Sequence, residues 1–132
     1  MAPRYTKISE LEYDLLELLN DCCRHIKDLG LGGNPVYWGD SKARDLMFGI
    51  IVAQKGLVIL NLGRDFYSKS AGCKLSAPDT TFLMKCLSTS HKDTLKEVDL
   101  CDSANFDEDE GCHNLCKLVA DAWKLKMMDI RA

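Results

Sequence analysis

The first apolar pattern along the chain predicts an amphipathic helix that runs from Ser9 to Leu29. Ser9 and Glu12 form a capping box, in which each side chain can bond a free backbone N–H group at the helix start. Gly30 follows the pattern and is the residue type that commonly ends a helix. The apolar stripe repeats at intervals of three and four residues and comprises Leu11, Leu15, Leu18, Leu19, Cys22, Ile26 and Leu29.

The longest apolar stretch, residues 46–62, has two competing interpretations. A helix would have to contain Gly49, Gly56 and the β-branched run 50–52, all of which are unfavourable within a helix. A hairpin would instead use Gly56 in its turn, where a positive φ is needed. Neither half of the stretch alternates between apolar and polar residues, so both faces should be covered. We favour a hairpin over residues 49–63, with a buried helix as the alternative.

Three further elements follow this stretch. Residues 80–87 fit either a strand or a short helix capped by Asp79. Residues 95–100 alternate weakly between apolar and polar residues and predict a strand. Residues 110–130 predict a second amphipathic helix. Its apolar stripe comprises Cys112, Leu115, Cys116, Val119, Ala122, Trp123, Met127 and Ile130.

This order of elements predicts a single α+β domain over residues 1–132. An antiparallel sheet would be built around the central hairpin and packed by the N-terminal and C-terminal amphipathic helices. A mostly helical fold is the alternative if residues 46–62 form a buried helix. No internal repeat is evident in the sequence.

Composition and charge place the chain among ordinary globular proteins. Apolar residues make up 46% of the chain and charged residues 28%, and 17 basic against 20 acidic side chains give a net charge of −3. This balance does not point to a polyanionic partner. Gln54 and Lys55 interrupt the longest apolar stretch, so no membrane-spanning helix is expected. The first residues lack the apolar core of a signal peptide, and a cytoplasmic protein is therefore predicted, with a nuclear location as an alternative.

Cysteine is the most distinctive residue type in the chain. An odd count fits a closed disulfide framework poorly and favours buried thiols in a reducing compartment. Cys112 and Cys116 share one helix face, and Cys22 with His25 could complete a zinc site only if the two helices pack together. No cysteine lies in a nucleophile motif, so no metal, cofactor or catalytic residue is predicted. The seven cysteines are Cys22, Cys23, Cys73, Cys86, Cys101, Cys112 and Cys116.

Aromatic residues in loops give the chain its best candidate function. They flank the predicted hairpin together with one arginine, and aromatic and arginine side chains commonly anchor protein interfaces. We therefore expect a non-catalytic adaptor or regulatory module that binds a protein partner or forms homo-oligomers. A small nucleic-acid-binding regulatory protein, of the kind viruses encode, is the alternative, and a thiol- or zinc-dependent enzyme is the third hypothesis. The candidate partner-binding residues are Tyr37, Trp38, Arg64, Phe66 and Tyr67.

Overall fold

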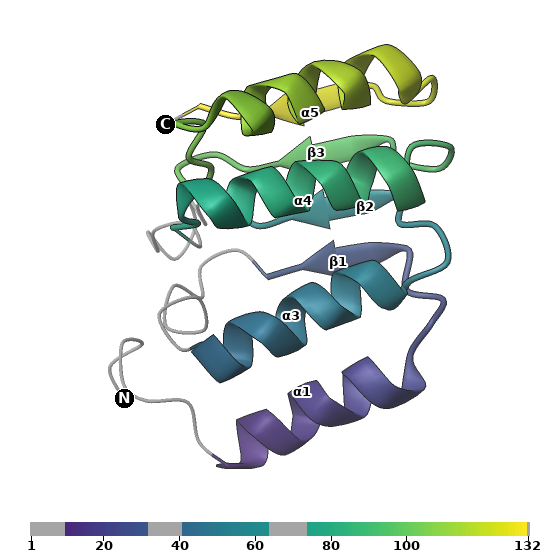
Figure 1. The fold of residues 1–132 in the computed structure, drawn as a ribbon. Coiled ribbons are helices and arrows are strands. Elements are labelled where there is room, and N and C mark those ends of the chain that lie inside the picture. The colour runs from purple at the N-terminus through teal and green to yellow at the C-terminus, as the bar shows by residue number, and fades with distance from the viewer. Residues whose placement is uncertain (1–9, 32–40, 64–73, 132) are drawn as a thin grey trace.

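Four helix–strand pairs follow one another along the chain (Figure 1). This computed structural model describes residues 10–31, 41–63 and 74–131. We number the pairs repeats 1 to 4, since each has one helix followed by one strand. They are α1 (Glu10–Cys22) with β1 (Asp28–Gly30), α3 (Ser41–Ala53) with β2 (Ile59–Asn61), α4 (Ala77–Ser90) with β3 (Glu97–Asp99), and α5 (Asp109–Asp121) with β4 (Met127–Asp129).

The four strands form one parallel sheet in the order β1-β2-β3-β4. Their central residues are in register, so Leu29 pairs with Leu60, Leu60 with Val98, and Val98 with Met128. In the described part of the chain, all four helices lie in one layer on the same face of the sheet (Figure 1). The predicted antiparallel sheet is therefore wrong, and the fold is of the α/β kind. The regular stacking of similar units is the arrangement of a solenoid.

Each strand lies within a six-residue segment whose first, fourth and sixth residues are apolar. The four segments are residues 26–31, 57–62, 95–100 and 125–130. In repeats 2 and 3 all three apolar side chains of each segment are completely buried. Successive residues of an extended chain point to opposite faces, so the fourth and sixth residues of each segment point toward the helices and the fifth points away, whereas the first residue comes before the strand. An internal repeat, which the sequence analysis did not detect, thus underlies the sheet.

The predicted hairpin over residues 49–63 does not form. Its first half belongs to α3 and its second half contains β2, which pairs with β1 and β3 rather than with a neighbouring half of a hairpin. Gly49 has a packing role within the helix, because α1 comes close to α3 at this point. The Oδ1 atom of Asn20 on α1 lies 2.7 Å from the place where a Cβ atom would be, so glycine leaves room for the contact. Ile50 and Ile51 are buried, and tertiary burial overrides their weak helix propensity.

The predicted terminal helices are both too long. α1 ends at Cys22, and Gly30 lies in β1 instead of capping the helix. α5 ends at Asp121, so the last part of the predicted 110–130 helix is a loop followed by β4. In both cases the apolar spacing of the strand segment happens to continue the helical stripe. Residues 80–87 belong to α4, whose N-cap is Ser76 rather than Asp79, and the strand expected over residues 95–100 contains β3.

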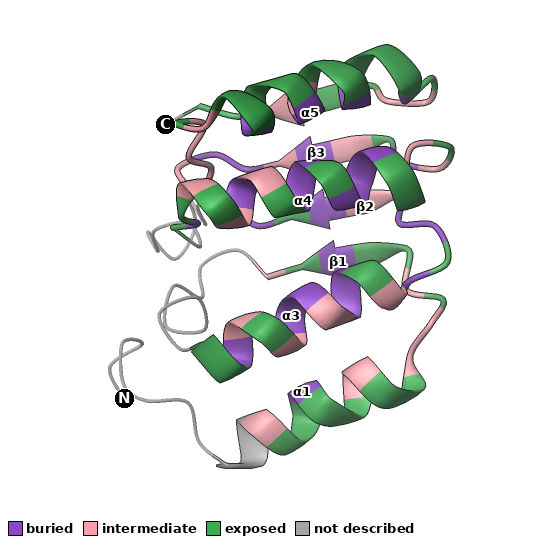
Figure 2. Ribbon diagram, in the orientation of Figure 1, coloured by how far each residue is buried: buried purple, intermediate pink, exposed green. Residues whose placement is uncertain are grey.

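The core lies between the helix layer and the sheet (Figure 2). Its largest completely buried side chains come from repeats 2 and 3, which have a neighbouring repeat on each side. They are Met47, Ile50, Ile51, Leu57, Leu60, Leu62, Leu83, Met84, Leu87, Leu95 and Leu100, with Leu118 added from repeat 4. The strand-segment side chains of the inner repeats are thus completely buried, whereas Ile130, which occupies the same position as Leu62 and Leu100, is 37% exposed.

Two buried polar side chains connect neighbouring repeats just after the end of a helix. Gln54, after α3, accepts a hydrogen bond from the backbone N–H of Ile26 at 2.8 Å and donates one to the carbonyl of Cys23 at 3.0 Å. His91, after α4, accepts at Nδ1 from the N–H of Leu57 at 3.1 Å. Ile26 and Leu57 occupy the same position in their six-residue segments. A buried polar group therefore satisfies the same backbone donor in repeats 1 and 2.

Candidate binding site at the carboxyl edge of the sheet

The predicted partner-binding residues fall in two segments outside the described residues. Tyr37 and Trp38 lie between β1 and α3, and Arg64, Phe66 and Tyr67 lie between β2 and α4. Both segments follow the carboxyl ends of strands that are hydrogen-bonded neighbours. The chain therefore leaves the sheet for both segments at one edge, the edge that carries the carboxyl ends of the strands.

A row of short polar side chains runs along this edge. Asn61, Asp99 and Asp129 are the last residues of β2, β3 and β4, and each points away from the helix layer. The Oδ1 atom of each accepts a hydrogen bond from the backbone N–H two residues later, at 2.9, 3.0 and 3.1 Å respectively. This bond bends the chain out of each strand in the same way. This row was not among the residues predicted from the sequence, although an Asn or Asp precedes the last apolar residue of three segments.

An arginine neutralises the last member of the row. Arg131 donates from Nη2 to Oδ2 of Asp129 at 2.6 Å and from Nε to Oδ1 at 3.0 Å. These hydrogen bonds to Arg131 lower the pKa of Asp129 below its ordinary value, so the carboxylate remains charged. The row thus offers an amide at one end, a carboxylate in the middle and an ion pair at the other end.

A cavity of about 550 Å³ opens at the same edge of the sheet, lined by residues that follow β2, β3 and β4 and not by the row itself. It lies between the start of repeat 3 and the loop that follows β3. Phe106 and Ile130 supply apolar surface, and Asn105 and Asp107 supply polar groups. The full lining is Lys74, Leu75, Asp102, Ser103, Ala104, Asn105, Phe106, Asp107 and Ile130. A hollow with both apolar and polar walls suits the side chains of a partner better than a smooth surface does.

Two lining residues of this cavity have left-handed backbone conformations. Lys74 has φ of 55° and Asp102 has φ of 60°, and they are the only non-glycine residues with positive φ in the described part of the chain. Lys74 Nζ donates to Oδ1 of Asp102 at 2.8 Å, so the two strained residues are joined by an ion pair. Backbone hydrogen bonds from Leu75 to Ser103 and from Asp102 to Arg131 hold the geometry. Strain of this kind is often concentrated at functional sites.

The fold does not bring Cys22 and His25 beside Cys112 and Cys116. The zinc hypothesis requires α1 to pack against α5, but these helices lie at opposite ends of the helix layer (Figure 1). No group of three or more potential ligands occurs among the described residues. Burial raises the pKa of Cys86 to about 11, so this thiol remains protonated near neutral pH and is a poor nucleophile. Within the same residues, no helix is both long and apolar enough to cross a membrane.

The strand segments resemble the L-x-x-L-x-L part of leucine-rich repeats, which also place one strand in each repeat along a parallel sheet. The central residues of the strands are 31, 38 and 30 positions apart, from Leu29 to Leu60, Val98 and Met128. These spacings exceed the roughly 20–29 residues of that repeat class. Comparison with known proteins gave no matching family model, no matching curated protein and no matching solved structure. The class is therefore defined by architecture: a helix–strand solenoid.

Proposed function

We propose that this protein is a non-catalytic protein-binding module that binds its partner at the carboxyl edge of the sheet. The observation that carries this proposal is the strained Lys74–Asp102 pair, which lines a 550 Å³ cavity at the same edge of the sheet as the Asn61–Asp99–Asp129 row. Solenoids commonly use the open sheet face and its edge as an extended binding surface.

The chemistry of this edge also favours recognition over catalysis. Asn61, Asp99 and Asp129 already accept backbone hydrogen bonds, so their side chains are held in fixed positions. The Oδ1 atom of Asp99 would lie 2.5 Å from a Cβ atom at position 63, and only a glycine fits there. Rigid polar groups near a hollow with apolar and polar walls provide specificity at low entropic cost to binding.

A peptide library displayed on phage provides a test that does not require the natural partner. Peptides selected on the wild-type protein would be measured against Asn61→Lys in the row and Asp107→Lys in the cavity. The matched control is Asp93→Lys, which makes the same charge change as Asp107→Lys in the loop between α4 and β3, at the opposite edge of the sheet. We expect both site variants to lose about tenfold or more in affinity, as substitutions in a binding centre commonly do. Selected peptides that bind all four proteins equally would contradict the proposed site.

A further inference from the structure

Both ends of the solenoid present an apolar stripe where the inner repeats have a neighbour. On α1, Leu15 and Leu18 are 56% and 57% exposed, and Cys22 continues their line. On α5, Val119 is 56% exposed and lies beside the exposed Cys116, and Trp123, 72% exposed, follows the helix. We call these the α1 stripe and the α5 stripe.

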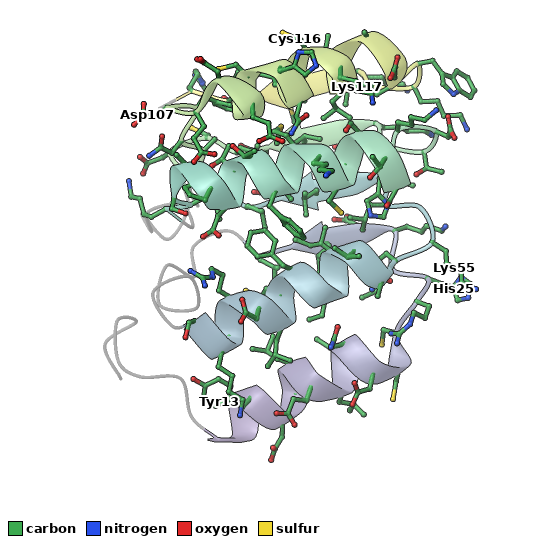
Figure 3. The ribbon with its side chains drawn as sticks, viewed as in Figure 1. Tyr13, His25, Lys55, Asp107, Cys116 and Lys117 are labelled. Atoms are coloured by element: carbon green, nitrogen blue, oxygen red, sulfur yellow. The ribbon has the colours of Figure 1, made fainter. Side chains whose placement is uncertain are left out.

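Contacts with the inner helices show which way the two stripes face. Asn20 of α1 lies against Gly49 of α3, and the Nδ2 atom of Asn114 on α5 donates to the carbonyl of Thr81 on α4 at 3.4 Å. Residues two or five positions from each asparagine lie about 140–200° around the helix, because successive residues are about 100° apart. In the α1 stripe, Leu18 and Cys22 are two positions from Asn20 and Leu15 is five positions from it. In the α5 stripe, Cys116 is two positions from Asn114 and Val119 is five positions from it. Both stripes therefore face outward along the row of helices, and Figure 3 shows Cys116 on the flank of α5 away from α4.

The charges next to the two stripes differ. The described side chains of α1 include Asp14, Glu17 and Asp21 and no basic residue, with Lys42 of α3 3.5 Å from Glu17, and Arg24 and Lys27 follow the helix. The α5 end is balanced, with Lys117, Lys124 and Lys126 against Asp109, Glu110 and Asp121, apart from the internally paired Asp129 and Arg131. Contact between two α1 ends would bring acidic groups together, whereas contact between an α1 end and an α5 end places lysines near those acidic groups.

We propose that copies of this chain associate head to tail, with the α5 stripe of one copy packed on the α1 stripe of the next. β4 of the first copy would then lie beside β1 of the second, with Met127 opposite Asp28. This continues the register in which Asp28 pairs with Ile59, Ile59 with Glu97, and Glu97 with Met127 within the chain. The contact is heterologous, so the assembly is open-ended and grows with concentration. It uses the two ends of the solenoid and does not rest on the binding site proposed above.

Two blocked variants test the direction of this contact in a reducing buffer. Leu18→Glu blocks the α1 end, and Val119→Glu blocks the α5 end. Both side chains are exposed in the monomer, so the fold should be retained, and circular dichroism checks this. Sedimentation velocity of the wild type should show assemblies that grow with concentration, whereas each variant alone should remain a monomer. An equimolar mixture of the two variants should form a dimer that grows no further, because each supplies one intact end.

The control is Val52→Glu, which places the same charge at a 44% exposed valine of the inner helix α3 and should associate like the wild type. A wild type that remains monomeric at every concentration would overturn the proposal. So would a Leu18→Glu protein that still dimerises alone, since this would indicate contact between two α5 ends. A mixture that remains monomeric would exclude the head-to-tail direction as well.

Discussion

His91 is the residue whose substitution should weaken the solenoid most selectively between repeats 2 and 3. The ring is completely buried, accepts at Nδ1 from the Leu57 N–H at 3.1 Å and donates from Nε2 to the Ile51 carbonyl at 2.8 Å. His91→Ala leaves both backbone groups buried and unpaired, at a cost of about 1–3 kcal/mol each. The expected loss is thus about 2–6 kcal/mol, before any cavity is counted, against a total stability of about 5–15 kcal/mol for a typical domain.

His91→Gln should recover most of this loss. Gln54 already performs the equivalent task one repeat earlier, where its Oε1 accepts from the Ile26 N–H and its Nε2 donates to the Cys23 carbonyl. A glutamine at position 91 has the same donor and acceptor groups on a similar length of side chain. Urea denaturation followed by circular dichroism at pH 8 compares the three proteins. We expect the order of stability to be wild type, then Gln, then Ala.

The pH dependence separates the role of the histidine from simple packing. Burial lowers the pKa of His91 from its ordinary value of 6.5, and the bond to the Ile51 carbonyl opposes this only in part. The unfolded chain therefore binds more protons than the folded chain below pH 6.5, and stability falls as the pH decreases from 6.5 toward the lowered pKa. The slope can reach about 1.4 kcal/mol per pH unit for one group. His91→Gln removes this group, so its stability should be flatter between pH 7 and pH 5.5.

Two results would refute this reasoning about His91. A loss below about 1 kcal/mol for His91→Ala would mean that the two backbone groups find other partners, since an unpaired buried group costs at least that much. An identical pH dependence in wild type and His91→Gln would mean that other residues cause the pH effect. The comparison subtracts the remaining titratable groups, which both proteins share.

Three further substitutions or measurements test other parts of the fold. Gly56→Ala should lower the free energy of unfolding by about 1–2 kcal/mol, because Gly56 has φ of +112° and the new Cβ would lie 3.0 Å from Thr94 Cγ2. Urea denaturation measures this change, and an unchanged free energy of unfolding would contradict the prediction. Ser103→Ala should cost about 1–3 kcal/mol by the same measurement, since its hydroxyl donates to the buried Leu62 carbonyl, and a neutral result would show that water replaces it. Labelling at neutral pH with mass-spectrometric readout should modify the exposed thiols of α1 and α5 well before Cys86, whose pKa is about 11; early labelling of Cys86 would indicate local opening.

The sequence predicted the amphipathic helices correctly in kind but not in length. The apolar residues of α1 and the strand residue Leu29 fall on one helical stripe by coincidence, and the same holds for α5 and Ile130. Periodicity alone cannot distinguish a continued helix from a helix followed by a buried strand of three residues. The three-residue strands are too short to show the alternation that normally identifies a strand, and Ile59 and Met127 add a second apolar residue to β2 and β4.

The internal repeat was hidden by unequal spacing rather than by weak chemistry. The steps between strand centres are 31, 38 and 30 residues, and the longest contains the 64–73 segment outside the described residues. Aligning residues 57–62 with 95–100 by their three apolar positions would have indicated a parallel arrangement. The polar row could then have been predicted, since Asn61 and Asp99 occupy the same place in the two segments. The Lys74–Asp102 pair could not, because it depends on backbone conformations that no local pattern specifies.

The interface between repeats 2 and 3 differs from the interface between repeats 3 and 4. α3 and α4 touch through Phe48 and Phe82, whose rings meet edge to face with centroids 5.3 Å apart. A hollow of about 420 Å³ beside these rings leaves Phe82 49% exposed. α4 and α5 are joined by hydrogen bonds: the hydroxyl of Thr81 donates to Glu108, and the carbonyl of Thr81 accepts from Nδ2 of Asn114.

This difference explains why a polar side chain is buried at position 91. In a solenoid each repeat contacts only its neighbours, so overall stability depends on every interface between them. The helices contribute least between repeats 2 and 3, and the sheet and His91 must hold these repeats together. A leucine at position 91 would fill the space but leave the Leu57 N–H unpaired. The imidazole instead accepts from the Leu57 N–H and donates to the carbonyl of Ile51 near the end of α3. The histidine thus confers stability at neutral pH and makes this interface the one that acid should open first.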